Sequence, residues 1–270
     1  MSDEVATTPE LMSVVIPIGK VDGWLDEAVD SVLSQEGVEL ELIAVFNNGA
    51  NVPDDWKFLT DHRVKIIHDT RSLGSGGAGQ RGIDSAKGEY FVRLDSDDRM
   101  RPGRLRQQYD YMKSHLDTVL VSSQVDWINE RGEKVGSFDL PSGADVRDQI
   151  LSLNICPHPS WAARMETVRQ AGGYDPEMDQ MDDYDLLLRI AAAGKVAILP
   201  DTLTDYRLHS GQMSRAVKPN GHYVKVIAER RRYLGAAIGV AAWRVALARC
   251  WWETQQWMMY FGRKVRGLWR

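Results

Sequence analysis

Three carboxylates in four positions follow a short apolar stretch in the first half of the chain. Residues 90–94 are rich in strand-forming side chains, and Asp95, Ser96, Asp97 and Asp98 come directly after them. Carboxylates this close repel one another and usually need a cation to neutralise them. Acids at the carboxyl end of a strand also lie where open α/β sheets bind their ligands. The run therefore indicates a divalent cation holding a diphosphate, although a solvated turn in which Asp98 caps the next segment fits the same residues.

A second acidic cluster, Asp179, Asp182, Asp183 and Asp185, precedes leucines at helical spacing. Acids favour the first turn of a helix because they oppose its dipole and cap free amides, and Asp185 can pair with Arg189 four residues later. Alternatively, one carboxylate projects into the site as a general base. For that role it must lie within hydrogen-bond reach of an acceptor hydroxyl.

A glycine-rich segment that precedes both clusters contains G-x-G-x-x-G at Gly74, Gly76 and Gly79. With an acid downstream at Asp95, this pattern is typical of dinucleotide-binding sites and leaves an NAD-type oxidoreductase as an alternative. Against that reading, the segment follows the third expected strand instead of the first, and a ribose needs one carboxylate, not three. Exposed amides at a helix N-terminus can cradle any phosphate, and a flexible turn would also suit the glycines.

The elements that position these residues alternate along the first half of the chain. Strands are expected at residues 12–17, 40–46, 64–67 and 90–94, with helices over 24–33 and 78–86. Repeated β-α units predict an α/β fold with a mainly parallel, doubly wound sheet. Farther along, the pattern predicts a helix at 102–115, a hairpin of 119–128 with 135–138, helices at 144–152, 164–171 and 182–193, and strands near 195–199 and 203–208.

Composition restricts the class of protein. The 270 residues are 43% hydrophobic and 26% charged, as in an ordinary globular chain large enough for one domain and an appendage. Two distant cysteines, Cys156 and Cys250, form neither a disulfide framework nor a zinc pattern, which predicts a reducing cytoplasm. Residues 1–11 are polar and acidic, unlike a signal peptide, and we expect them to be disordered. No apolar run reaches the ~18 residues of a spanning helix.

The last part of the chain differs from the rest in charge. Residues 218–270 carry eleven Lys or Arg against two acids, a net charge of +9 that leaves −14 for the remainder. Five of the nine tryptophans also lie there. A mostly apolar stripe recurs at helical spacing along Trp243, Leu247, Cys250, Trp251, Thr254, Trp257 and Phe261.

This composition predicts a helical tail over residues 216–270, appended to a domain over residues 12–215. Tryptophan with Lys and Arg suits a membrane interface carrying anionic lipid. The alternatives are a helix packed on the domain or against another subunit. No nucleic-acid partner is expected, since the acidic body would repel phosphates.

Taken together, the motifs resemble a known family over residues 12–215. They are Val-Val-Ile-Pro at 14–17, Arg-Gly-Ile-Asp-Ser-Ala-Lys-Gly-Glu-Tyr at 81–90, Leu-Asp-Ser-Asp-Asp at 94–98, Gly-Gly-Tyr-Asp at 172–175, Asp-Asp-Tyr-Asp-Leu-Leu-Leu-Arg at 182–189 and Tyr-Arg-Leu-His-Ser-Gly-Gln-Met-Ser at 206–214. Their order and spacing resemble the family 2 glycosyltransferases, inverting enzymes of the GT-A fold. The resemblance implies transfer of a sugar from a nucleoside-diphosphate sugar to a glycan or lipid-linked acceptor, at the inner face of a bacterial membrane.

The resemblance also implies roles for individual residues. Asp97 would bind Mn²⁺ or Mg²⁺, and His209 resembles a late histidine that meets the metal or the diphosphate. Asp183 matches the general base, with Asp182 in place of the usual neighbouring glutamate. The nucleotide-sugar site would contain Pro17, Asn47, Asn48, Gly76, Arg81, Asp95 and Ser96.

Departures from the family pattern stand at Gly19, Lys20, Asn47, Asn48, Gly79 and Gln80. Acids usually occupy the positions of Asn47 and Asn48, where an Asp accepts the uracil N3–H; an Asn can accept through its carbonyl but brings no charge. These changes put UDP in doubt and leave open a non-catalytic relative that only binds nucleotide sugars. Retention of both Asp97 and Asp183 argues against that alternative.

Overall fold

Four parallel strands form the first half of the sheet and confirm the expected β-α alternation. The computed structural model describes residues 10–178, 180–212 and 221–267, with side chains up to residue 258. Most of the segment 1–11 expected to be disordered, and the expected boundary near 215, therefore lie outside the described residues. The strands are β1 (Met12–Ile18), β2 (Leu40–Phe46), β3 (Val64–His68) and β4 (Tyr90–Arg93), in the order β3-β2-β1-β4. The helices α1 (Leu25–Leu33) and α2 (Gly74–Ser85) connect them.

The second half of the sheet is mixed, so the expectation of a mainly parallel sheet holds only for the first four strands. Its strands are β5 (Arg99–Met100), β6 (Thr118–Ile128), β7 (Lys134–Ser137), β8 (Ala162–Arg164) and β9 (Lys195–Arg207). The short β8, which the sequence pattern missed, runs antiparallel between β4 and β6, and β6 runs parallel to β9.

One long strand, β9, replaces the two strands expected near 195–199 and 203–208. Its register against β6 shifts after Leu199, and pairing resumes at Thr202. The skipped residues begin with Pro200, which has no N–H to donate to a ladder. A bulge around the proline therefore lets the strand continue to Arg207.

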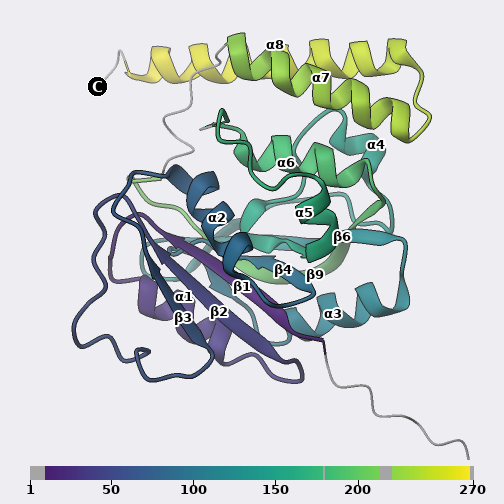
Figure 1. Cartoon of the computed structure of the whole chain (residues 1–270). Coiled ribbons are helices and arrows are strands. Elements are labelled where there is room, and N and C mark those ends of the chain that lie inside the picture. The colour runs from purple at the N-terminus through teal and green to yellow at the C-terminus, as the bar shows by residue number, and fades with distance from the viewer. Residues whose placement is uncertain (1–9, 179, 213–220, 268–270) are drawn as a thin grey trace, which may run out of the picture.

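Helices cover both faces of the sheet (Figure 1). On one face lie α1 and α3 (Arg104–Ser114), which share a buried apolar cluster with β1 and β2. On the other lie α2, α5 (Met165–Gln170) and α6 (Asp182–Ala191), while α4 (Arg147–Ile150) and a 3₁₀ turn (His158–Ser160) complete the connections.

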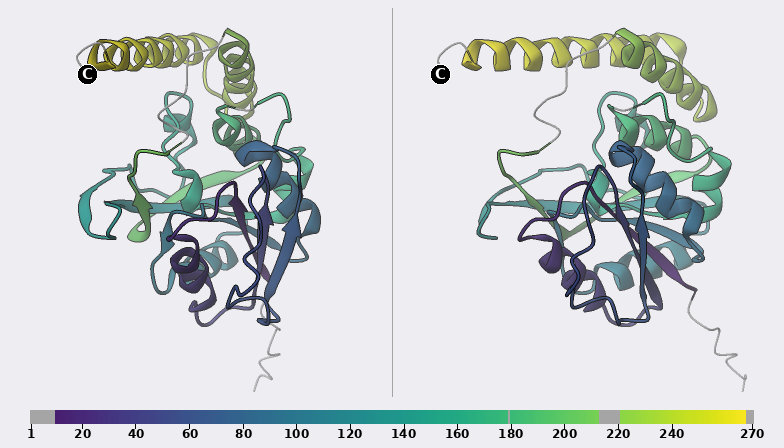
Figure 2. Two further views of the ribbon diagram at one scale, coloured as in Figure 1. Left: turned by 90° about the vertical axis from the view of Figure 1, so that its left-hand side faces the viewer. Right: turned by 60° about the vertical axis from the view of Figure 1, so that its left-hand side comes forward.

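The C-terminal helices α7 (Gly221–Ala237) and α8 (Ala242–Gly267) form a further layer against α6 (Figures 1 and 2). Tyr223 and Ile227 of α7, with Val245 and Trp252 of α8, belong to the same buried cluster as α6. The apolar stripe expected from the sequence lies on a different face: Trp243 is 66% exposed, and Leu247 and Trp251 are exposed as well. The side chain of Phe261 lies outside the described residues.

α8 is therefore apolar on two faces, one packed and one open to solvent. Although α8 is 26 residues long, no described helix combines the length and apolar character needed to cross a membrane.

Candidate active site

The acidic loop, residues 95–98, begins where β4 ends, beside the end of β1. β1 lies between β2 and β4, so the connections that follow these strands leave the sheet in different directions. In open α/β sheets such a point is where ligands bind. Pro17 is buried in β1, and Asn47 follows the last residue of β2. The sheet thus brings the expected nucleotide residues and the acidic loop to one edge.

Asp95 is held by an arginine that the sequence pattern did not single out. Arg93 is 1% exposed, and its Nε and Nη2 donate to Asp95 Oδ1 at 2.9 and 2.8 Å. Nη2 also donates to Ser75 Oγ at the start of α2 (2.7 Å), while the buried Nη1 has no partner among the described residues. Arg93 lies inside an apolar strand, so nothing in the sequence pattern distinguishes it as a site residue. Its contacts fix Asp95 against α2.

Asp97 and His209 meet across 112 positions of sequence. Asp97 Oδ2 and His209 Nε2 are 2.7 Å apart, and the His209 ring packs on Trp24 with centroids 4.8 Å apart. Burial, followed by the charge of Asp95, raises the pKa of the Asp97 carboxyl. The structure thus brings together the two residues expected to meet a metal. Ser96, between the two acids, is half-buried.

Asp98 does not cap the next helix, because α3 begins after Gly103. Its side chain is buried: Oδ1 accepts the Arg207 N–H at 2.8 Å, and Oδ2 has no partner among the described residues. Burial, then the charges of Asp97 and Asp95, raises its pKa well above the ordinary value. The loop is therefore only partly solvated, since Asp98 is buried while the side chains of Asp95 and Asp97 are 31% and 24% exposed.

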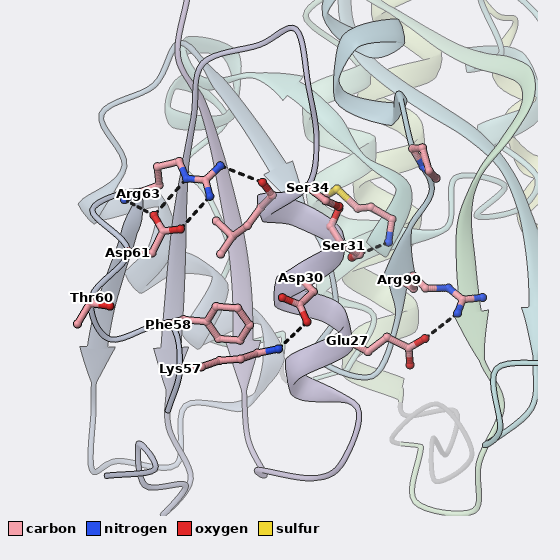
Figure 3. A pocket seen from close by; sticks show the side chains of 13 residues that line it. Glu27, Asp30, Ser31, Ser34, Lys57, Phe58, Thr60, Asp61, Arg63 and Arg99 are labelled. Carbon is pink, nitrogen blue, oxygen red and sulfur yellow. Dashed lines mark hydrogen bonds and ion pairs between the residues drawn. The ribbon is translucent and has the colours of Figure 1, made fainter. Parts of the chain in front are cut away.

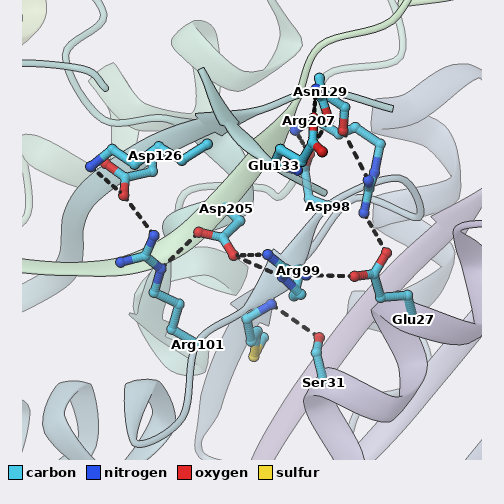
Figure 4. Close-up of polar contacts among 12 residues, drawn as sticks. Glu27, Ser31, Asp98, Arg99, Arg101, Asp126, Asn129, Glu133, Asp205 and Arg207 are labelled. Atoms are coloured by element: carbon cyan, nitrogen blue, oxygen red, sulfur yellow. Dashed lines mark hydrogen bonds and ion pairs between the residues drawn. The ribbon is translucent and has the colours of Figure 1, made fainter. Parts of the chain in front are cut away.

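A network of ion pairs supports this loop from below (Figure 4). Arg207 donates from Nε to the Asp97 carbonyl at 2.8 Å and also pairs with Glu27 of α1. Arg99 joins Glu27 to Asp205, each pair 2.6 or 2.7 Å apart. These contacts tie α1, β5 and β9 together beneath the acidic loop.

The donor set fits a cation that is shared with a bound anion. Within residues 10–178, 180–212 and 221–267, no three His, Cys, Asp or Glu side chains are grouped to hold a metal alone. Asp97 and His209 could supply an oxygen and a nitrogen ligand, and Asp98 Oδ2 is a buried oxygen with no partner among the described residues. Diphosphate oxygens and water are the ligands with which Mg²⁺ commonly completes its shell.

The expected base, Asp183, is held from two sides at the start of α6. Its Oδ1 accepts the Tyr184 N–H at 2.7 Å, and its Oδ2 accepts from Asn154 Nδ2 at 2.8 Å. Burial raises the pKa of Asp183, while both hydrogen bonds favour the charged form. Asn154 lies on a loop with no recognisable pattern, so sequence reasoning missed it.

Asp182 faces the glycine-rich helix. A Cβ added at Gly76 would lie 2.7 Å from Asp182 Oδ2, which has no partner among the described residues. Burial, then the charge of Asp183, raises the pKa of Asp182 to about 7. Asp185 turns away from both, binding Arg189 as expected and also Arg230 of α7. The two carboxylates at the start of α6 therefore have different surroundings.

The glycine pattern has a packing explanation. The segment is not a loop, because α2 already begins at Gly74. Side chains at Gly76 and Gly79 would collide with Asp182 and with the Tyr174 ring, the latter at 2.6 Å. These glycines let the helix approach the acidic residues closely.

The remaining expected residues lie around the ends of β2 and β3. Asn47 is buried and its Nδ2 donates to the Ile18 carbonyl at 3.3 Å, while Asn48 has a positive φ of 55° and accepts from Ser72. Arg81 pairs with Asp69 beyond β3 at 3.3 Å and is 46% exposed. Arg81 thus contacts the β3 loop, a different part of the edge from the acidic cluster.

A family model described as glycosyl transferase family 2 matches residues 13–170. The chain belongs to this family. It is 29% identical over 209 residues to the O-antigen biosynthesis glycosyltransferase WbnJ of Escherichia coli, covering 74% of this chain and 81% of that protein. It is 27% identical over 206 residues to an uncharacterized glycosyltransferase of Methanocaldococcus jannaschii, covering 73% and 71%.

The GT-A fold of this glycosyltransferase is confirmed by solved structures. It resembles residues 1–349 of Staphylococcus aureus TarS in complex with UDP-GlcNAc, with a TM-score of 0.66 and 17% identity over 81% of this chain. The chain spans 66% of that TarS chain. Family membership confirms the resemblance read from the motifs and decides against the oxidoreductase that the glycine pattern left open.

A hollow on the described surface of this glycosyltransferase lies away from these residues (Figure 3). It is an open groove of about 880 Å³ between α1, the segment 57–63 and β5. Its charged side chains pair with one another or with the network below the acidic loop, as in Lys57–Asp30 and Arg63–Asp61. None of the expected site residues lines it.

Proposed function

We propose that the protein is a metal-dependent inverting enzyme that moves a sugar from a nucleoside-diphosphate sugar to an acceptor hydroxyl during synthesis of a surface glycan or glycolipid. The observation that carries this proposal is the meeting of Asp97 with His209 at the strand edge where α2 presents its N-terminus. The neighbour TarS was solved with UDP-GlcNAc, which supports a nucleotide-sugar donor. WbnJ, an O-antigen enzyme, supports a surface glycan.

In this proposal Asp97 and His209 would hold Mn²⁺ or Mg²⁺. When bound, the cation would offset the charge that develops on the departing diphosphate. Arg93 keeps Asp95 fixed beside the donor, and Pro17, Asn47 and Asn48 border the nucleotide base. A non-catalytic relative would have no need for the desolvated carboxylates at the start of α6.

Asp183 acts as the general base. It takes the proton of the acceptor hydroxyl, whose oxygen bonds to the anomeric carbon on the face opposite the donor phosphate. The bond from that carbon to the phosphate oxygen breaks, and its electron pair leaves with the nucleoside diphosphate. Asn154 and the Tyr184 N–H orient the Asp183 carboxylate, in the way that a third group commonly orients a base. Asp182 faces α2 and therefore lies on the donor side.

A melting-point screen tests the donor and metal assignments. Nucleoside diphosphates with Mn²⁺ should raise the melting temperature by roughly 5 °C or more at about 100 times their Kd, since ligand binding stabilises only the folded state. The shift should disappear in excess EDTA. Comparing UDP, GDP, CDP and TDP would identify the base. Stabilisation by NADH without metal, and by none of these nucleotides, would contradict the proposal.

We also propose that the enzyme works at the membrane surface through the open face of α8. This face presents Trp243, Leu247, Trp251 and Met258, while Trp252 and Val245 on the opposite side are buried. The net charge of +9 over residues 218–270 complements anionic lipid. A lipid-linked acceptor would then meet the enzyme where both are held at one surface.

Vesicle co-sedimentation tests this docking. The protein should bind vesicles of phosphatidylglycerol and phosphatidylcholine, and less so as salt shortens the electrostatic reach to ~8 Å at physiological strength. Replacing Trp243, Leu247 and Trp251 together by Ser should weaken binding by roughly 100-fold or more, because each side chain loses its apolar burial. Leu116→Ser, which alters a 78% exposed leucine of the body, is the matched control. If the triple variant binds vesicles as well as the wild type, α8 does not mediate membrane binding and the proposal is wrong.

A further inference from the structure

A fully buried arginine joins α7 to the helix that carries the proposed base. Arg231 is 0% exposed, and its guanidinium lies over the Trp252 ring of α8 at 4.4 Å and over the Tyr184 ring of α6 at 5.2 Å. Its Nη2 and Nε donate to Tyr184 Oη at 2.9 and 3.2 Å. Tyr184 Oη in turn donates to the Ile150 carbonyl at 2.6 Å. One cation therefore connects three helices.

The residue that Arg231 holds is the immediate neighbour of Asp183. The Tyr184 N–H donates to Asp183 Oδ1, so the position of Tyr184 sets the position of that donor. Arg230, the preceding residue of α7, adds a second contact by donating from Nε to Asp185 Oδ1 at 2.8 Å. Two consecutive arginines of α7 thus contact two consecutive residues near the start of α6, Tyr184 and Asp185. The chain enters α6 through Met181, which has a φ of 61° and makes no side-chain cap.

A contribution to stability does not by itself explain why an arginine occupies this buried position. Among the described residues, Arg231 contacts no carboxylate, and its Nη1 has no hydrogen-bond partner. A buried charge without a counter-ion is costly, and an apolar side chain of similar volume is often neutral or stabilising in such a place. Cation–π contacts and the bonds to Tyr184 offset part of that cost. What an apolar side chain could not supply is the directed pair of hydrogen bonds to Tyr184.

We propose that Arg231 is a positioning residue, which acts through Tyr184 to hold the Asp183 carboxylate in the orientation needed for proton transfer. This inference rests on the proposed function, because it assigns Arg231 to the reaction in which Asp183 is the base. It makes α7 and α8 part of the catalytic apparatus instead of an appendage. A misplacement of about 1 Å at a reacting group can cost on the order of 100-fold in rate. Arg231 acts on Asp183 through Tyr184, so its loss should have a measurable effect on the rate even though Arg231 does not touch the substrate.

Arg231→Met and the matched control Arg232→Met test this role. Arg232 is the next residue of α7, and its side chain is 70% exposed. Hydrogen–deuterium exchange should show the amides of residues 182–185 exchanging about tenfold faster in Arg231→Met and unchanged in Arg232→Met. Hydrolysis of UDP-GlcNAc and GDP-mannose, with water in place of the acceptor, should slow by roughly 10- to 100-fold in Arg231→Met alone. Nucleotide affinity should stay within about twofold, and Arg231→Lys should recover part of the rate.

The two readouts separate this inference from the proposed function. Unchanged exchange and unchanged hydrolysis in a folded Arg231→Met would overturn the positioning role. If Arg231→Met does not fold, Tyr184→Phe supplies the same test, because it removes the acceptor of both arginine bonds. Wild-type protein that hydrolyses and binds no nucleotide sugar would refute the proposed function, while the exchange of residues 182–185 would still report whether Arg231 holds α6.

Discussion

Replacing Asp183 with Asn is expected to lower the rate of sugar transfer by roughly 10²- to 10⁴-fold, the range typical for loss of a general base. The asparagine keeps the shape of the side chain and can still accept from Asn154 through its carbonyl, so donor affinity should be unchanged. Transfer rates and nucleotide binding, measured on the same preparation, decide the matter. Collapse of donor binding together with the rate would place Asp183 in the nucleotide site instead.

The pH dependence of transfer and the variant Asp182→Asn complete this test. The base must be deprotonated to accept a proton, and burial raises the pKa of Asp183 while that of Asp182 rises to about 7. The rate should therefore fall at acidic pH, with an acid limb above the range of an ordinary aspartate, and level off at higher pH. Asp182→Asn removes a neighbouring negative charge, which should move this acid limb to lower pH with a smaller loss of rate. A larger loss in Asp182→Asn than in Asp183→Asn would make Asp182 the base.

Replacing Asp97 with Asn should reduce transfer on the order of 10³-fold or more, with the fold intact. The substitution removes a charged oxygen ligand, and a Lewis-acidic cation contributes several kcal/mol to leaving-group stabilisation. Nucleotide binding should weaken in Mn²⁺ and become insensitive to EDTA, which isothermal titration would measure. Asp201→Asn, at an exposed acid on β9, is the control. Full wild-type activity in excess EDTA would contradict the metal assignment.

The sequence predicted the first four strands closely because each is a short apolar run closed by turn residues. β2 was expected over 40–46, where the structure has it. β8 was missed because three residues with no alternation carry no periodic signal. The start of α2 was placed at residue 78 instead of Gly74, since glycines disfavour helices unless tertiary packing rewards them. At Gly76 that packing is the approach of Asp182.

The acids of the site could be named from sequence because their clustering is local. Their supports could not. Arg93 contacts Asp95 two positions away, Asn154 contacts Asp183 29 positions away, and Arg231 contacts Tyr184 47 positions away. The last two contacts depend entirely on how distant segments meet. Even the contact between Asp97 and His209 was implied only by resemblance. The direction of the tail stripe was equally inaccessible, since spacing shows that α8 has an apolar face but not which way it points.

The two apolar faces of α8 should be under different constraints on substitution. Trp252 and Val245 are committed to partners inside this same polypeptide, so their replacement must be matched by changes in α6 or α7. Trp243, Leu247 and Trp251 are exposed, and in the proposed docking they would meet lipid, where any bulky amphiphilic residue serves equally well. Among homologous chains, substitutions on the buried face of α8 should covary with substitutions in α6 and α7. Substitutions on the exposed face should vary freely in residue type while staying bulky and amphiphilic. The two faces of one helix would thus show two different patterns of substitution.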